Sequence, residues 1–116
     1  MKEDVILSQS ATIGGRKFDS GKPQYGLIPT KALKETVNVL TRGAVKYEPE
    51  NWKFVPDAQN RYFDALQRHL WDWKSGEKHD PETGINHLAH ACCNILFLLE
   101  RDSTPPEEWE ELTRQK

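Results

Sequence analysis

The sequence predicts an all-α fold, a small helical bundle with long ordered loops, built on two long helices that face each other. Two segments, about 57–75 and about 81–101, carry apolar residues at the three- and four-residue steps of an amphipathic helix. No segment alternates apolar and polar residues with the two-residue period of a strand. A chain of 116 residues is long enough for one core and too short for two. We therefore expect one helical unit, with a shorter helix before the long pair and a short helix after it.

The first part of the chain is predicted to contain no long element. Residues 1–16 mix charges, Ser, Thr and Gly-Gly without periodicity, which is typical of a mobile arm. Residues 17–29 are rich in turn-forming residues and end in proline, which predicts an ordered loop that opens the single helical domain, residues 17–116.

The shorter helix is predicted to begin with Thr30 as its N-cap and to run to about Arg42, with Gly43 ending it. Its apolar side consists of Leu33, Val37 and Leu40. Residues 44–56 form a second loop, which brings together a cation, two aromatic rings and an amide at Lys46, Tyr47, Asn51 and Trp52. Such a composition is common in loops that contact ligands.

The first long helix is predicted to open at Asp57 and to run to about Ser75, with Gly76 as its terminator. Its apolar stripe consists of Tyr62, Leu66, Leu70 and Trp73. A second line along the helix, beside His69, consists of Asp64, Arg68 and Asp72. This line is open to two interpretations, a set of solvated i,i+4 ion pairs or part of a site.

The second long helix is predicted to begin with Asp80 as N-cap and Pro81 as its first residue. Residues 85–99 carry no charge, and at about 100° per residue their strongly polar members project into one arc: Asn86, His87, His90 and Asn94. Apolar side chains fill much of the remainder: Leu88, Cys92, Ile95, Leu96 and Leu99. We interpret this segment as a buried helix with one polar stripe, in which Cys92 and Cys93 are small core residues. The stripe needs partners, which are either ordinary neighbouring groups or a ligand.

The last helix is predicted from a capping box that starts at Thr104, with Pro105 at the first helical position and Glu107 closing the box. Trp109 and Leu112 are its expected docking side chains.

Composition excludes several classes of protein. The formal net charge of −2 argues against the broad basic surface of a protein dedicated to stable nucleic-acid binding. No apolar run approaches the roughly 20 residues that span a bilayer, and the N-terminus lacks the pattern of a secretory signal. We expect a cytoplasmic protein without membrane contact. A buried helix that needs cover on both sides in so small a chain also predicts a homo-oligomer.

Three acids lie just before the second long helix, which itself carries two histidines. Glu77, Asp80 and Glu82 with His87 and His90 form the oxygen and imidazole set that a divalent metal needs, and the excess of acids favours Mg²⁺ or Mn²⁺. The alternative is that Asp80 and Glu82 only complement the helix dipole in the first turn. Glu77 precedes the cap, so the dipole explains it less well.

Taken together, the motifs over residues 17–99 resemble the bacteriophage dATP/dGTP diphosphohydrolase domain. They are Lys17-x-Asp19-x-Gly21-Lys22-Pro23, Leu27-x-Pro29, Gly43-Ala44-x-Lys46-Tyr47, Asn51-Trp52, Asp64-Ala65-x-x-Arg68-His69, Gly76-Glu77-x-x-Asp80-x-Glu82-x-Gly84 and His87-Leu88-x-His90-Ala91-x-x-Asn94. The resemblance implies a nucleotide hydrolase that converts purine deoxynucleoside triphosphates to the monophosphate and pyrophosphate, in the host cytoplasm if a phage encodes it. It also implies kinship with the MazG-like all-α pyrophosphohydrolases, although the paired Glu-x-x-Glu and Glu-x-x-Asp patterns of those enzymes are not intact here.

This interpretation gives each candidate residue a role. A metal-activated water attacks the triphosphate, cations bind phosphate oxygens, and an aromatic ring stacks on the purine. The metal ligands are Glu77, Asp80, Glu82, His87 and His90; the catalytic residues are Glu77, Asp80, Arg68 and His69; the substrate-binding residues are Lys22, Lys46, Tyr47, Asn51, Trp52, Asp64 and Asn94. Two other functions remain open from the sequence: a phage regulatory module that binds a nucleotide without turnover, and a helical protein-interaction domain.

Overall fold

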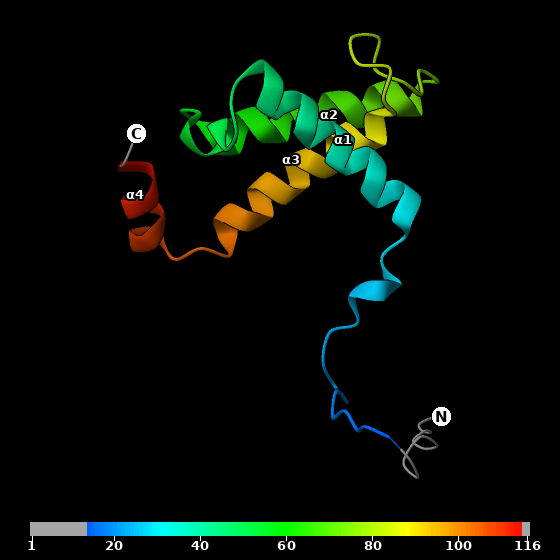
Figure 1. Cartoon of the computed structure of the whole chain (residues 1–116). Coiled ribbons are helices and arrows are strands. Elements are labelled where there is room, and N and C mark those ends of the chain that lie inside the picture. The colour runs from blue at the N-terminus through cyan, green and yellow to red at the C-terminus, as the bar shows by residue number, and fades with distance from the viewer. Residues whose placement is uncertain (1–13, 115–116) are drawn as a thin grey trace.

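The structure is a computed structural model that describes residues 14–114, and it is all-α (Figure 1). Four α-helices, α1 (Thr30–Lys46), α2 (Ala58–Lys74), α3 (His87–Asp102) and α4 (Pro106–Arg114), are joined by loops that contain two short 3₁₀ helices, η1 (Tyr25–Leu27) and η2 (Asn51–Phe54). Over residues 14–114 no strand forms, so the predicted fold class is confirmed. Most of the expected N-terminal arm lies outside the described residues.

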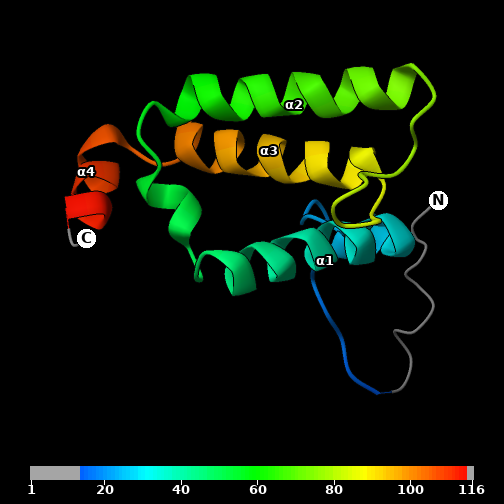
Figure 2. The same ribbon diagram turned by 90° about the horizontal axis from the view of Figure 1, so that it is seen from above.

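Three helices lie side by side, with α3 in the middle (Figure 2). Helix α3 packs against both α2 and α1, and α2 runs antiparallel to the other two. The buried positions of α3 hold small side chains, Ala89, Ala91 and Cys93, which allow its neighbours to approach closely. The Cys93 thiol also donates a hydrogen bond to the backbone oxygen of Thr36 on α1, at 3.4 Å.

Helix α1 is longer than predicted. It starts at Thr30 with Pro29 as N-cap, so Thr30 is not the cap, and it continues past Gly43 to Lys46. A glycine inside a helix costs only about 1 kcal/mol relative to alanine, and the helix-forming residues after it recover this cost. Part of the predicted loop 44–56 is therefore the last turn of α1, and the apolar side chains of Leu33 and Val37 are about half exposed.

Helix α3 starts six residues later than predicted, because residues 80–85 form a closed loop. The Asp80 carboxylate accepts hydrogen bonds from the backbone N–H groups of Glu82 (2.7 Å) and Thr83 (3.1 Å), and Gly84 turns the chain at a φ of +75°. The N-cap is Asn86, whose side chain accepts from Leu88 N. The prediction that Asp80 caps the helix was wrong. The acids therefore lie in a loop, and helix-dipole compensation in a first turn does not account for Asp80 and Glu82.

An aromatic cluster joins α4 to η2 and α3. Trp52 of η2 stacks on Phe97 of α3, with ring centroids 4.8 Å apart, and Trp109 of α4 leans on Trp52 at 5.8 Å. Helix α4 begins at Pro106, one residue later than predicted. The Thr104 hydroxyl, which was expected to cap α4, donates a hydrogen bond to a backbone carbonyl at the end of α3. Leu112 is exposed, so its predicted docking was wrong.

The expectation that the large apolar side chains of α3 are buried was wrong. Its apolar residues Leu88, Cys92, Ile95, Leu96 and Leu99 are exposed, whereas Cys93 is buried. The helix has neighbours on two sides only, and nothing in residues 14–114 covers this remaining face. Among the described residues, no helix is long and apolar enough to cross a membrane.

Candidate active site

A cleft of about 550 Å³ lies between the C-terminal half of α1, the middle of α2 and the loop before α3. Lys46 and Arg42 line it from α1, and His69 lines it from α2. The loop contributes Asp80, Glu82 and Thr83, and α3 contributes His90. The cleft thus combines two cations with acidic and imidazole groups. This combination suits a phosphate ester held next to a group that can take a proton or bind a metal.

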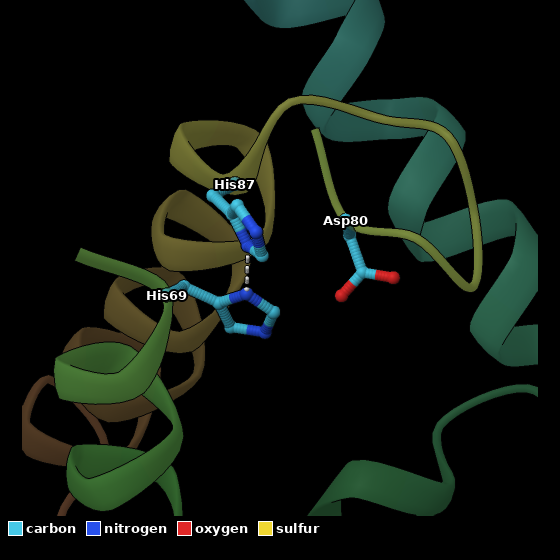
Figure 3. A group of neighbouring side chains, drawn as sticks. All are labelled: His69, Asp80 and His87. Atoms are coloured by element: carbon cyan, nitrogen blue, oxygen red, sulfur yellow. Dashed lines mark hydrogen bonds between the residues drawn. The ribbon is translucent and has the colours of Figure 1, made fainter. Parts of the chain in front are cut away.

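A chain of hydrogen bonds leads into this cleft through a buried histidine. His87, which is 1% exposed, bonds through Nε2 to the Glu77 carboxylate at 2.8 Å and through Nδ1 to His69 Nδ1, also at 2.8 Å. Figure 3 shows the two imidazoles meeting, with the Asp80 carboxylate to one side. Gly76, at a φ of +114°, lets the chain turn after α2 and brings Glu77 back to α3.

The hydrogen bonds are consistent with one assignment of protons in the two rings. A carboxylate only accepts, so we assign the proton of His87 to Nε2, which faces Glu77, and the accepting lone pair to Nδ1. His69 Nδ1 must then donate, which leaves His69 Nε2 as a bare lone pair. His69, on the wall of the cleft, is therefore set up as a base or a ligand.

The two histidines that line the cleft are held neutral. The rings of His69 and His90 stack, with centroids 4.7 Å apart and planes 11° from parallel, and His90 Nε2 shares a hydrogen bond with the Thr83 hydroxyl at 2.8 Å. Burial lowers the pKa of His69, and the neighbouring His90 and His87 lower it further. Burial also lowers the pKa of His90, more than the nearby Asp80 carboxylate raises it. Both rings are therefore available as lone-pair donors at neutral pH.

Asp80 remains a carboxylate in the same place. Partial burial by itself raises the pKa of this acid, but hydrogen bonds from the backbone N–H groups of Thr83 and Glu82, followed by the nearby histidines, lower it below its ordinary value. The loop thus presents a fixed negative charge beside two neutral imidazoles.

The mouth of the cleft is bridged by an ion pair. Lys46 Nζ at the end of α1 lies 3.0 Å from Glu82 Oε2, and both side chains are more than half exposed. The hydrogen bond to Glu82 raises the pKa of Lys46, which therefore stays cationic. Lys46 also lies 5.2 Å from the ring centroid of Tyr47. A phosphate group that enters here can replace the Glu82 carboxylate on Lys46 at little cost, since the pair is open to water.

The donor atoms fit a divalent metal in two groups. His69, Asp80 and His87 have ligand atoms within 4.8 Å of one another, and so do Asp72, Glu77 and His87. The first group, which borders the cleft, offers two nitrogens and one oxygen. Such a set suits Mn²⁺ or another transition metal better than Mg²⁺, which prefers oxygen ligands throughout. Of the predicted ligands, Glu82 and His90 lie on the cleft wall but belong to neither group.

Several predicted substrate-binding residues lie away from the cleft lining. Lys22 lies in the extended segment before α1. Asn51 and Trp52 belong to η2, and the Trp52 ring is already stacked on Phe97. Tyr47 does line the cleft.

The polar line along α2 and the end of the polar arc on α3 also lie outside the lining. Asp64 and Arg68 are exposed on α2, and within residues 14–114 Arg68 forms no ion pair with Asp64 or Asp72. Asn94 is buried and donates to the His90 carbonyl within its own helix, at 2.9 Å.

Three residues of the site were not among the predicted ones. Asp72 lies three residues after His69 on the same face of α2, and its carboxylate belongs with Glu77 and His87 to the second possible ligand group. Arg42 lines the cleft from within the predicted span of α1, and Thr83 lines it because the 80–85 loop closes, a feature without a local sequence signal.

Comparison with known proteins identifies the chain. A model of the family described as "dATP/dGTP diphosphohydrolase, N-terminal" matches residues 12–110. The chain belongs to this family. The resemblance drawn from the motifs is thereby confirmed.

A relative in the family gives the extent of the match. A protein of Salmonella phage PMBT28 named "dATP/dGTP diphosphohydrolase" is 37% identical over 84 residues, which cover 72% of this chain and 28% of that protein. The chain thus spans less than a third of the relative that it matches. No solved structure matches the chain.

Proposed function

We propose that this chain hydrolyses purine deoxynucleoside triphosphates, dATP and dGTP, to the monophosphate and pyrophosphate in the cleft between α1 and the loop before α3. The observation that carries the proposal is the cleft itself, where Lys46 and Arg42 face His69 and Asp80 across about 550 Å³. Membership of the family and the name of the phage relative support the substrate class. The site of action that follows is the host cytoplasm, where the nucleotide pool is.

The residues divide the work by their chemistry. Lys46 and Arg42 bind the triphosphate oxygens, and Tyr47 at the end of α1 stacks on the base. His69 Nε2 takes a proton from the attacking water, while the Glu77–His87 pair holds its tautomer and stabilises the imidazolium that forms. Asp80, fixed by two backbone N–H groups, orients the same water.

A divalent metal fits the group that borders the cleft. We propose that His69, Asp80 and His87 provide its ligands in place of the His69–His87 hydrogen bond, with Glu77 holding His87 through Nε2, and that Mn²⁺ is the preferred ion. This arrangement is an alternative to the base role of His69, because one ring cannot serve both purposes at once. When bound, the ion neutralises phosphate charge and lowers the pKa of a coordinated water. None of the residues Lys22, Asp64 and Arg68 lines the cleft. We therefore propose that they contact only the part of the substrate that extends out of it.

The decisive experiment is a substrate panel. The full chain is incubated with each of the four deoxynucleoside and four ribonucleoside triphosphates, with Mn²⁺ or Mg²⁺, and the products are separated by ion-exchange chromatography. We expect pyrophosphate and a monophosphate from dATP and dGTP, faster with Mn²⁺, and no turnover by His69→Gln. Release of orthophosphate, or equal rates for pyrimidine nucleotides, would contradict the proposed reaction.

A second function is favoured by one specific observation. The family is described as an N-terminal region, and the match covers 28% of the phage relative. Residues of that protein outside the match can therefore contribute to its turnover. In that case the cleft binds the nucleotide without hydrolysing it. Isothermal titration with dGTP separates the two functions, because binding with no product after prolonged incubation supports the binding module. The third function, a helical interaction domain, predicts neither binding nor turnover.

A further inference from the structure

Two apolar surfaces of this chain have no cover within residues 14–114. The first is the α3 stripe, which we define as Leu88, Cys92, Ile95, Leu96 and Leu99. It runs along one face of α3 from its first turn to its last, and its leucine and isoleucine side chains are 40% to 57% exposed. Neither α1 nor α2 lies over it. A continuous apolar stripe along a whole helix is a candidate contact surface.

The second surface is the leading segment, residues 17–28, which runs away from the three-helix layer in Figure 1. Its large side chains project into water: Phe18 is 82% exposed, Tyr25 is 79% exposed and Leu27 is 77% exposed. The turn of 3₁₀ helix at Tyr25–Leu27 gives these residues a defined shape, and Pro29 leads the segment into α1. A structured segment with exposed aromatic and aliphatic side chains is suited to fill a groove on another surface.

The two surfaces are sufficient in number for a stable pair. A two-fold pair contains two segment–stripe contacts, which together supply the roughly 800 Å² that each partner of a stable pair buries.

We propose that the chain forms a two-fold pair in which each copy lays its leading segment on the α3 stripe of the other. Each copy has one such segment and one such stripe, so a closed two-fold pair covers both surfaces on both copies and leaves none over. The proposal does not depend on the proposed function. It names the contact through which the predicted homo-oligomer forms.

The native cysteines allow a direct test. Cys92 is exposed within the α3 stripe, whereas Cys93 is buried and its burial raises the pKa of the thiol to about 12, so only Cys92 reacts readily. The full-length variants Leu27→Cys and Tyr25→Cys are treated with a mild oxidant and run on a non-reducing gel. We expect a covalent dimer from at least one of them, and its loss when Cys92→Ser is added.

The other outcomes overturn the proposal. A disulfide within one chain, seen as loss of thiols at monomer mass, would mean that the leading segment covers its own α3. Equal cross-linking of the unmodified chain through Cys92 would mean that two stripes face each other. Absence of any cross-link from both variants would exclude contact between the segment and the stripe.

A charge in the stripe tests the pairing without cysteine chemistry. Ile95→Glu places a carboxylate at a position that is 48% exposed, so the single chain should still fold. The matched control is Phe63→Glu on α2, which is 51% exposed and belongs to neither surface. By light scattering at the same concentration, we expect the mass of Ile95→Glu to halve and that of Phe63→Glu to stay at two chains. A monomeric parent chain, or a dimeric Ile95→Glu, contradicts the proposal.

Discussion

The bond between His69 and His87 should appear as a coupling free energy in a double-mutant cycle. His87 is 1% exposed and uses both ring nitrogens, so His87→Ala removes two hydrogen bonds and leaves a cavity. Each hydrogen bond contributes about 1 kcal/mol and the cavity about 1 kcal/mol more, so the free energy of unfolding should fall by about 3 kcal/mol. For a chain of this length, that loss lowers the Tm by about 12 °C.

The second arm of the cycle is His69→Ala. This ring is only half buried, and its removal should cost about 1.5 kcal/mol, of which the bond to His87 is the larger part. The double variant loses the shared bond once, so its loss should be smaller than the sum by about 1 kcal/mol.

Thermal and urea unfolding, followed by far-ultraviolet circular dichroism at pH 7.5 and one protein concentration, measure all four forms. The matched control is His79→Ala, which changes an exposed histidine next to the same loop and should shift the free energy of unfolding by less than about 0.5 kcal/mol. If the two losses add to within about 0.3 kcal/mol, the imidazoles do not share a bond, and the fixed lone pair on His69 has no basis.

Three further outcomes follow from the same geometry. Glu77→Gln should keep the fold, because the side chain is half exposed. It should lower kcat at least 10-fold, because the carboxylate no longer holds the tautomer of His87. A change in Tm with unchanged kcat would contradict this. Lys46→Ala should raise KM for dGTP about 10-fold with little change in kcat, as expected for a cation that binds ground-state phosphate. The control is Lys34→Ala, which is exposed on α1 outside the cleft lining and should change neither constant. Burial lowers the pKa of His69 and of His90 below the ordinary value of 6.5, so the unfolded chain binds more protons than the folded chain at acid pH. The free energy of unfolding should therefore be complete above pH 6.5 and fall as the pH drops below it, less steeply for His90→Gln. A flat pH profile in urea titrations would exclude the effect.

The helices were predictable where apolar spacing was the only signal needed. Helix α2 begins at Ala58, one residue after the predicted opening at Asp57, and its span and the absence of strands over residues 14–114 follow from the period of the sequence. The Asp57 side chain makes no capping hydrogen bond, so the expected cap is not what sets this start. The start of α3 was not predictable, because the Asp80 carboxylate satisfies loop N–H groups as readily as it would satisfy a helix N-terminus. The sequence shows that an acid before a helix has a hydrogen-bonding role, but not which backbone groups it serves.

The site was predictable as a set of residue types and less so as a geometry. His87 lies with Asp80 in one possible ligand group and with Glu77 in the other, whereas the sequence placed both acids in one site. The pairing of His87 with His69 joins residues 18 positions apart on antiparallel helices, and it depends on the register between α2 and α3. That register is set by the small buried residues of α3, whose pattern indicates close packing but not its offset along the helix.

The polar and apolar sides of α3 explain each other once both are located. A helix that places His87 and Asn94 in the buried side must use small residues there, since Ala89, Ala91 and Cys93 leave space for imidazoles and their partners. The large apolar side chains are then displaced to the opposite face, where nothing in residues 14–114 covers them. One helix thus builds the site on one side and, as a consequence, needs a partner on the other. Pairing and catalysis should accordingly separate: Ile95→Glu is expected to change the mass of the assembly while the histidine cluster, measured by the His69–His87 coupling, stays intact. Loss of that coupling in Ile95→Glu would show that the pair, and not the single chain, holds the two imidazoles together.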